Sequence, residues 1–228
     1  MYCLFRFIVL VFVISLLHAK AIVVDDLENR SEFNEKELIY ACLDENKSAC
    51  DTLISSDLPS VDECNEDTSC IVIAHIYMNA KKHENAIPYL KKSCYFGILE
   101  ACFEYGLSYE IIGDYTQANA IYKRSCNQGF MSSCYNLAML YVNGLGVKAN
   151  IQKANRIFFE ACINNEEQSC YNLAISYKDG IGVKADRLKA RDFFKKACDL
   201  GMELGCKEYK IINAADFSIT IKDHLKQQ

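Results

Sequence analysis

The sequence has no tryptophan, no excess of positive charge and, beyond its first 21 residues, no long hydrophobic run. The lack of such a run excludes a membrane span in the rest of the chain, because a helix needs about 20 apolar residues to cross a bilayer. The 228 residues carry 25 Lys and Arg against 30 Asp and Glu. This acidic balance argues against nucleic acid or an anionic membrane surface as a partner.

The first 21 residues have the pattern of an export signal. Arg6 precedes an apolar run at residues 7–17, and Ala19-Lys20-Ala21 resembles a cleavage site. An uncleaved amphipathic anchor is the alternative. Cleavage after Ala21 would remove Cys3 and leave 12 of the 13 cysteines, an even number that favours disulfides in an oxidising compartment. We therefore expect an exported protein, periplasmic or secreted, with no membrane contact after cleavage.

The remaining cysteines form consecutive pairs, five of them eight positions apart and one six apart. Eight positions cover about 12 Å of an uninterrupted helix, whereas a disulfide requires Cα atoms within about 7 Å. A bonded pair therefore requires the helix to end and the chain to reverse between its members. The predicted bonds are Cys42–Cys50, Cys64–Cys70, Cys94–Cys102, Cys126–Cys134, Cys162–Cys170 and Cys198–Cys206.

Metal binding is the competing interpretation of these thiols. No C-x-x-C motif occurs, and tightly bound zinc usually needs such a clip. Four of the first cysteines are instead followed, three positions later, by a residue that tolerates the positive φ of a helix end. These residues are Gly97, Gly129, Asn165 and Gly201. We expect structural disulfides, no metal and no cofactor.

The cysteine pairs belong to a repeat of 32 or 36 residues. Small residues recur four positions after the second cysteine, tyrosines seven positions after it, and alanines eight positions before the first. Each unit is predicted to form two helices, as at Cys134–Val142 and Ile151–Cys162. Helix pairs at this period predict an all-α fold, an α/α superhelical solenoid of disulfide-stapled hairpins.

The expected regions are a signal peptide at 1–21, an atypical N-terminal capping repeat at 22–62, repeats at 63–206, and a C-terminal capping helix and tail at 207–228.

Two segments carry a family resemblance: CYNLAMLYVNGLGVKANIQKANRIFFEAC and CYNLAISYKDGIGVKADRLKARDFFKKAC. They resemble Sel1-like repeats, relatives of the tetratricopeptide repeat. The cysteine pairs and export signal are similar to the Helicobacter cysteine-rich protein family, from which the spacing of Cys64 and Cys70 departs. The resemblance implies an exported, disulfide-bridged superhelix. It also implies two functions, a protein-binding module or penicillin binding with β-lactamase activity.

The lactamase function finds no motif in the sequence. A serine enzyme needs S-x-x-K and K-T-G, and neither occurs. A zinc enzyme needs several converging histidines and carboxylates. After signal cleavage only His75, His83 and His224 remain, scattered along the chain. β-Lactam hydrolysis therefore stands as the alternative function, with unknown catalytic residues.

A binding function favours the concave face of the solenoid, which the first helix of each unit lines. On this helix the residues two, six and nine positions after the second cysteine become polar in the later units. Asparagine there could hydrogen-bond the backbone of an extended peptide, or it could only cap or solvate the helix start. The candidate binding residues are Glu104, Ser108, Tyr135, Asn136, Asn143, Tyr171, Asn172 and Ser176.

The predicted partner is a protein or peptide, with a β-lactam or a cell-wall-related small molecule as the alternative ligand. We expect the chain to be a monomer.

Overall fold

The computed structural model describes residues 32–56, 58–64 and 69–226, and every regular element within them is an α-helix. The predicted export signal at residues 1–21 lies outside this part. The chain divides into two compact units, Met1–Ala101 and Cys102–Gln228, and each is considered by itself. Of the helices described, none combines the length and hydrophobicity that a membrane span requires.

The first unit contains a helical hairpin that carries the first disulfide. Helices α2 (Glu32–Leu43) and α3 (Lys47–Ser55) are joined by a turn at Glu45, whose φ of 66° is left-handed. Cys42 and Cys50 lie on either side of this turn, with Cα atoms 4.7 Å apart. Their spacing of eight positions therefore spans a chain reversal, as predicted.

The next two helices of this unit are α4 (Ser69–Asn79) and α5 (His83–Tyr95), which pack against each other. α4 also contacts the first hairpin, where Ile76 joins the apolar core around Leu53. The side-chain amide of Asn79 donates to the carbonyl of Cys42 at 2.8 Å. One apolar and one polar contact thus hold α4 to the α2–α3 hairpin.

The Cys64–Cys70 bond has a different setting from the other pairs. Cys64 lies in the loop that precedes α4, and Cys70 lies in the first turn of α4, with Cα atoms 5.3 Å apart. No helix runs directly into Cys64 in the described residues, so this bond ties a loop to a helix start. The shorter spacing of six positions accompanies this change of geometry.

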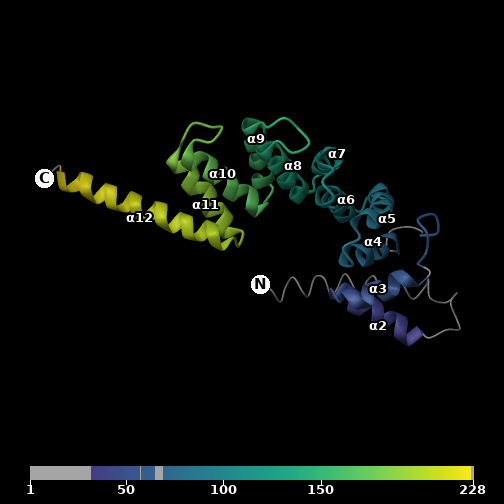
Figure 1. Ribbon diagram of the computed structural model, residues 1–228. Helices are drawn as coiled ribbons and strands as arrows, with labels where there is room; N and C mark the ends of the chain where they lie inside the picture. The colour runs from purple at the N-terminus through teal and green to yellow at the C-terminus, as the bar shows by residue number, and fades with distance from the viewer. Residues whose placement is uncertain (1–31, 57, 65–68, 227–228) are drawn as a thin grey trace. The chain divides into compact units, whose positions relative to one another are not determined.

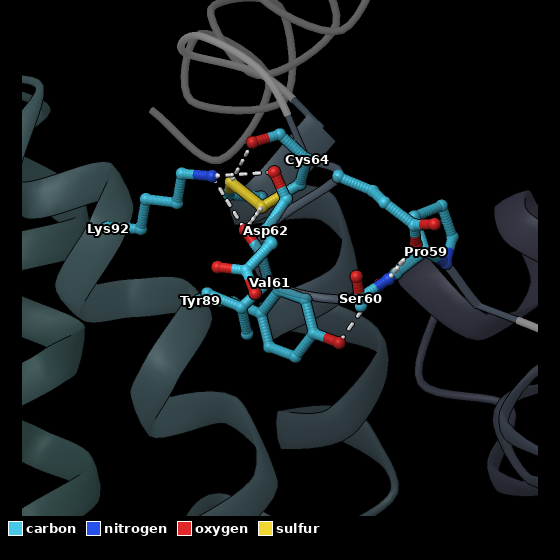
Figure 2. The surroundings of a disulfide bond; sticks show 9 residues. Pro59, Ser60, Val61, Asp62, Cys64, Tyr89 and Lys92 are labelled. Carbon is cyan, nitrogen blue, oxygen red and sulfur yellow. Dashed lines mark hydrogen bonds between the residues drawn. A yellow bond between two sulfur atoms is a disulfide. The ribbon is translucent and has the colours of Figure 1, made fainter.

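Helix α5 holds the loop that carries Cys64. The hydroxyl of Tyr89 donates to the carbonyl of Pro59 at 3.0 Å, and Nζ of Lys92 donates to the carbonyl of Val61 at 2.6 Å. Figure 2 shows both side chains reaching from the helix to the loop. Two side-chain hydrogen bonds and a disulfide therefore hold this loop in place, whereas the other first cysteines are held by the helix on which they lie.

The second unit consists of consecutive helices that pack in chain order, as α7 to α12 show in Figure 1. The predicted helix pair at Cys134–Val142 and Ile151–Cys162 corresponds to α8 and α9. α12 continues past the last disulfide into the region expected to be a cap. The helices are α6 (Leu99–Ile111), which runs across the unit boundary, α7 (Tyr115–Asn127), α8 (Met131–Asn143), α9 (Ile151–Ile163), α10 (Glu167–Asp179), α11 (Arg187–Asp199) and α12 (Glu203–Lys226).

Short turns with left-handed backbone separate α7 from α8, α9 from α10, and α11 from α12. Gly129, Asn165 and Gly201 occupy these turns with φ of 94°, 69° and 103°. Across them the paired cysteines have Cα separations of 4.7, 4.6 and 4.4 Å. Cys94 and Cys102 are each disulfide-bonded as well. The predicted reversals and disulfides are therefore present.

Longer loops connect α8 to α9 and α10 to α11, and each ends in a side-chain cap. Asn150 accepts a hydrogen bond from the backbone N–H of Lys153, and Asp186 accepts one from that of Lys189. Gly146 in the first loop has φ of 66°, and a Cβ there would collide with the backbone of Tyr115. The glycine lets this loop pack directly on the start of α7.

The core of the second unit repeats with the sequence. The recurring alanines and large apolar residues meet between successive helices and are buried. The clusters are Ala118 with Tyr122, Leu137 and Leu140, then Ala138 with Ala154, Phe158 and Leu173, then Ala174 with Ala190, Phe194 and Ile212. Each repeat thus buries its apolar face against its neighbours rather than in a single central core.

The Cys126–Cys134 bond gives a test of the stapled hairpin. Replacing both cysteines by alanine (Cys126→Ala with Cys134→Ala) should lower the free energy of unfolding by about 2.5 kcal/mol, because a short closed loop is released in the unfolded chain. Urea unfolding followed by circular dichroism measures the change, with the exposed Ser132→Ala as the matched control. Free thiols at these positions in the oxidised wild type, or equal stability of the two variants, would contradict the assignment.

Candidate functional site

The candidate binding residues all lie in the second unit, on helices α6, α8 and α10. Glu104 and Ser108 come from α6. The others are Tyr135, Asn136 and Asn143 on α8, and Tyr171, Asn172 and Ser176 on α10. Each of these helices contains the second cysteine of a pair near its start, so the repeat register gives the three sets equivalent places on their helices.

Two candidates are inside the helix packing. Ser108 is fully buried and Ser176 is 7% exposed. Their counterpart on α8, Leu140, is buried as well, at 1% exposed. Position six after the cysteine is about 60° around the helix from the buried position three, whereas positions two and nine are about 100–120° away. Ser108 and Ser176 therefore lie inside the helix packing, and the binding role of the candidate set stays a prediction.

Ser176 has a packing role that explains its burial. Its hydroxyl donates to Oδ1 of Asn155 at 2.8 Å, and Nδ2 of Asn155 donates to the carbonyl of Ile181 at 2.7 Å. Asn155 is 4% exposed. These two bonds join α9, α10 and the loop after α10. They also satisfy both the donor and the acceptor of the Asn155 amide, as a buried amide requires.

Asn136 is half-buried in the middle of α8 and takes part in a chain of side-chain hydrogen bonds. Its Nδ2 donates to the hydroxyl of Tyr122 at 3.1 Å, and that hydroxyl donates to Oε2 of Glu110 at 3.0 Å. The chain joins α8, α7 and α6. A mid-helix position with these contacts excludes helix capping as the role of Asn136.

The protonation state of Tyr122 fixes the donor and acceptor at each step of this chain of hydrogen bonds. Burial raises the pKa of Tyr122, the negative charge of Glu110 raises it further, and the hydrogen bond from Asn136 acts in the opposite sense. The hydroxyl therefore stays protonated and continues to donate to Glu110. Within the described residues Oδ1 of Asn136 accepts no hydrogen bond, so the amide is fixed in place with its acceptor available.

Asn172 occupies the equivalent position on α10 but is held differently. Its Nδ2 donates to the carbonyl of Gln168, one turn earlier, at 2.9 Å. The residue equivalent to Tyr122 in this repeat is Phe158, which has no hydroxyl to offer. Asn172 instead interacts with Tyr135 of α8. Burial and the charge of Glu166 raise the pKa of Tyr135, and the hydrogen bond with Asn172 opposes that rise.

The two tyrosines that precede the asparagines are half-buried against phenylalanine. The ring centroid of Tyr135 lies 6.0 Å from that of Phe158, and the centroid of Tyr171 lies 5.5 Å from that of Phe194. Each ring packs on the following helix of its own repeat. Among the other candidates, Glu104 is half-buried and Asn143 is exposed at the end of α8.

Sequence reasoning did not assign the residues that position Asn136 and Tyr135. Tyr122 and Glu110 hold Asn136, while Glu166 begins α10, where its carboxylate accepts the backbone N–H of Ser169 at 2.6 Å. Burial raises the pKa of Glu166, against the lowering effect of its bonds with Ser169. The available signal was a tyrosine at position 122, where the two following repeats have phenylalanine at 158 and 194 and the preceding one has leucine at 90.

The described residues give the lactamase alternative no support. They contain no group of three or more His, Cys, Asp or Glu side chains arranged to hold a metal ion. His75 and His83 lie on α4 and α5 of the first unit, and the side chain of His224 lies outside the described part. The described residues therefore place no lactamase residue.

Comparison with known protein families identifies the repeat. Residues 97–130, 132–165 and 167–202 match the Sel1 repeat, and residues 67–96 match a tetratricopeptide repeat. The matched segments coincide with the helix pairs of the second unit and with α4 and α5 of the first. No curated protein sequence matches the chain.

Solved structures with similar folds include two Sel1-type proteins. A protective antigen of uropathogenic Escherichia coli displaying an SLR fold is 24% identical over 64% of this chain and 33% of its own, with a TM-score of 0.58. A Sel1 repeat protein from Oxalobacter formigenes is 21% identical over 64% of this chain and 59% of its own, with a TM-score of 0.57. This chain therefore spans less than two thirds of either protein.

A third similar structure, cysteine-rich protein B of Helicobacter pylori, is 28% identical over 56% of this chain and 94% of its own, with a TM-score of 0.46. The repeat matches and the first two structures confirm the predicted fold class, an all-α solenoid of Sel1-like repeats.

The chain of hydrogen bonds through Tyr122 can be tested by removing one hydroxyl. Tyr122→Phe should lower the free energy of unfolding by about 1–2 kcal/mol, because Asn136 and Glu110 both lose a partner. Chemical denaturation measures the loss. Tyr115→Phe, which removes a hydroxyl on the same helix, should change stability by less than about 0.5 kcal/mol. Equal effects of the two substitutions would show that the chain contributes nothing.

Proposed function

We propose, from the premise that this chain is a Sel1-like repeat protein, that it is an exported interaction module whose helices α6, α8 and α10 bind an extended segment of a partner protein. Repeats of this type generally serve as protein-interaction modules, which supports the general function. The partner is proposed to contact the face of these helices that is expected to be concave, through the candidate residues on it.

The position of Asn136 is the observation that carries the proposal. Its side chain is fixed by Tyr122 and Glu110, with Oδ1 available. An asparagine amide presents one acceptor and two donors, which match the N–H and C=O groups of a peptide backbone. Because the side chain is already ordered, binding would lose little of its rotamer entropy.

The neighbouring side chains extend the surface around this amide. Asn172 lies one repeat further along with a second ordered amide, and Tyr135 and Tyr171 add rings whose hydroxyl-bearing ends suit a half-exposed contact. Glu104 and Asn143 are the remaining candidates. The amides would bind the backbone of a ligand and the rings would contact its side chains. This combination favours an extended peptide over a compact small molecule.

Export is supported by the cysteines. All twelve cysteines from Cys42 to Cys206 are disulfide-bonded, and such bonds persist in oxidising compartments rather than in a reducing cytosol. The proposed location is therefore the periplasm or the exterior of the cell. The proposed binding form is the monomer, since the interaction face belongs to a single chain.

The binding face is tested by removing its two amides. Peptides selected from a random display library on the oxidised protein should bind Asn136→Ala with Asn172→Ala about tenfold or more weakly, because each lost backbone hydrogen bond costs about 1 kcal/mol. Isothermal calorimetry with the selected peptides measures the affinities. The matched control is Gln117→Ala with Gln152→Ala, two exposed amides on α7 and α9.

Asn136→Ala also removes the bond to Tyr122, so Asn172→Ala alone is the second variant, and circular dichroism checks that each variant is folded. Unchanged affinity of the selected peptides for both asparagine variants would contradict the assignment of the face.

A further inference from the structure

The second unit has a surface depression on residues other than the candidate binding residues. Helices α7, α8 and α9 line a groove of about 510 Å³, which is within the usual range of about 300–1,000 Å³ for ligand sites. Its base is apolar, with the buried Leu137 and the half-buried Met131 and Ile157 beside the Cys126–Cys134 disulfide. We call it the α7–α9 groove. None of the candidate binding residues described above lines it.

The exposed rim of the α7–α9 groove is positively charged. Lys123 of α7 and Lys153 and Arg156 of α9 line it, against the single carboxylate of Glu160. The chain as a whole has a net charge of −5. Within the described residues neither Lys123 nor Arg156 forms an ion pair. The groove therefore carries cations on both walls without internal partners for two of them.

Lys153 has a defined position at the rim. Its Nζ donates to the hydroxyl of Tyr141 at 2.6 Å and lies 4.1 Å from the centroid of that ring. The next repeat keeps this pair, with Nζ of Lys189 lying 5.1 Å from the ring centroid of Tyr177. The lysine–tyrosine pair therefore recurs in the next repeat. Lysine also stands at the position of Lys123 in two other repeats, as Lys91 and Lys195, whereas Arg156 has no basic counterpart.

The next repeat, 36 residues further on, shows how the same arrangement is closed. Phe159 stands where the groove has Lys123, and Phe193 stands where it has Ile157. The two rings meet at 6.2 Å, and Phe193 also stacks on Tyr177 at 5.7 Å. The position of Arg156 is taken by Asp192. One repeat thus joins its helices with aromatic rings, while the preceding one leaves an open groove with a basic rim.

We propose that the α7–α9 groove binds an acidic peptide segment, with an apolar side chain seated on Met131 and Ile157 and carboxylates paired with Lys123 and Arg156. A guanidinium and an ammonium on opposite walls suit carboxylates that flank a central apolar residue. An anionic membrane is disfavoured as the occupant, because the net negative charge of the chain opposes approach to an extended negative surface.

The test uses a fluorescein-labelled octapeptide in which leucines are flanked by glutamates, and a control peptide with glutamine in place of each glutamate. Fluorescence anisotropy with the full oxidised protein should show binding of the glutamate peptide that weakens as salt is raised. The charge variant Lys123→Glu with Arg156→Glu should bind about tenfold more weakly. Its control, Lys207→Glu with Lys210→Glu, makes the same charge change at exposed positions of α12 and should bind within about twofold of wild type.

A second variant fills the groove as the next repeat does. Lys123→Phe with Ile157→Phe reproduces the Phe159–Phe193 contact, and it should abolish peptide binding while the helical circular dichroism spectrum is retained. If this variant does not fold, the charge variant decides the outcome. Three results would overturn the proposal: equal binding of the two peptides, equal loss in the charge variant and its control, or stronger binding to phosphatidylglycerol vesicles than to the glutamate peptide.

Discussion

The disulfide across each helix reversal is the constraint on which the repeats depend. A solenoid has no single central core, so each hairpin must hold its own geometry before it can pack on the next. The Cα separation of 4.7 Å between Cys126 and Cys134 fixes the end of α7 beside the start of α8. Once the helix ends are fixed, the recurring alanines and aromatic residues meet in register, and the polar side chains on α8 and α10 acquire set positions.

Much of this could be predicted from the sequence, because a bond between cysteines eight positions apart permits few backbone paths. The turns at Gly129 and Asn165 followed from that limit. The burial of Ser108 and Ser176 did not, since it depends on a helix rotation of about 60° and, for Ser176, on a partner from another helix, Asn155. Sequence periodicity therefore predicts which helices pack against each other more securely than it predicts which residues at the border of the buried face are covered.

Variation between repeats carries the functional information. At one position tyrosine replaces phenylalanine, and the hydroxyl of Tyr122 connects Glu110 to Asn136. At two others the α7–α9 groove has lysine and isoleucine where the next repeat has Phe159 and Phe193, and the groove stays open where that repeat is closed. Both differences are visible in the sequence once the repeats are aligned at their cysteines. The contacts that they create could not be predicted, because each contact depends on how three helices are placed.

The central claim is that an extended peptide is recognised through ordered amides on α8 and α10. The most direct measurement is a titration of the isotopically labelled protein with a selected peptide, followed by nitrogen–proton nuclear magnetic resonance. The account predicts that the side-chain amide signals of Asn136 and Asn172 shift together and saturate at one equivalent of peptide. Saturable binding that leaves both amide signals unmoved, with shifts confined to other helices, would contradict it.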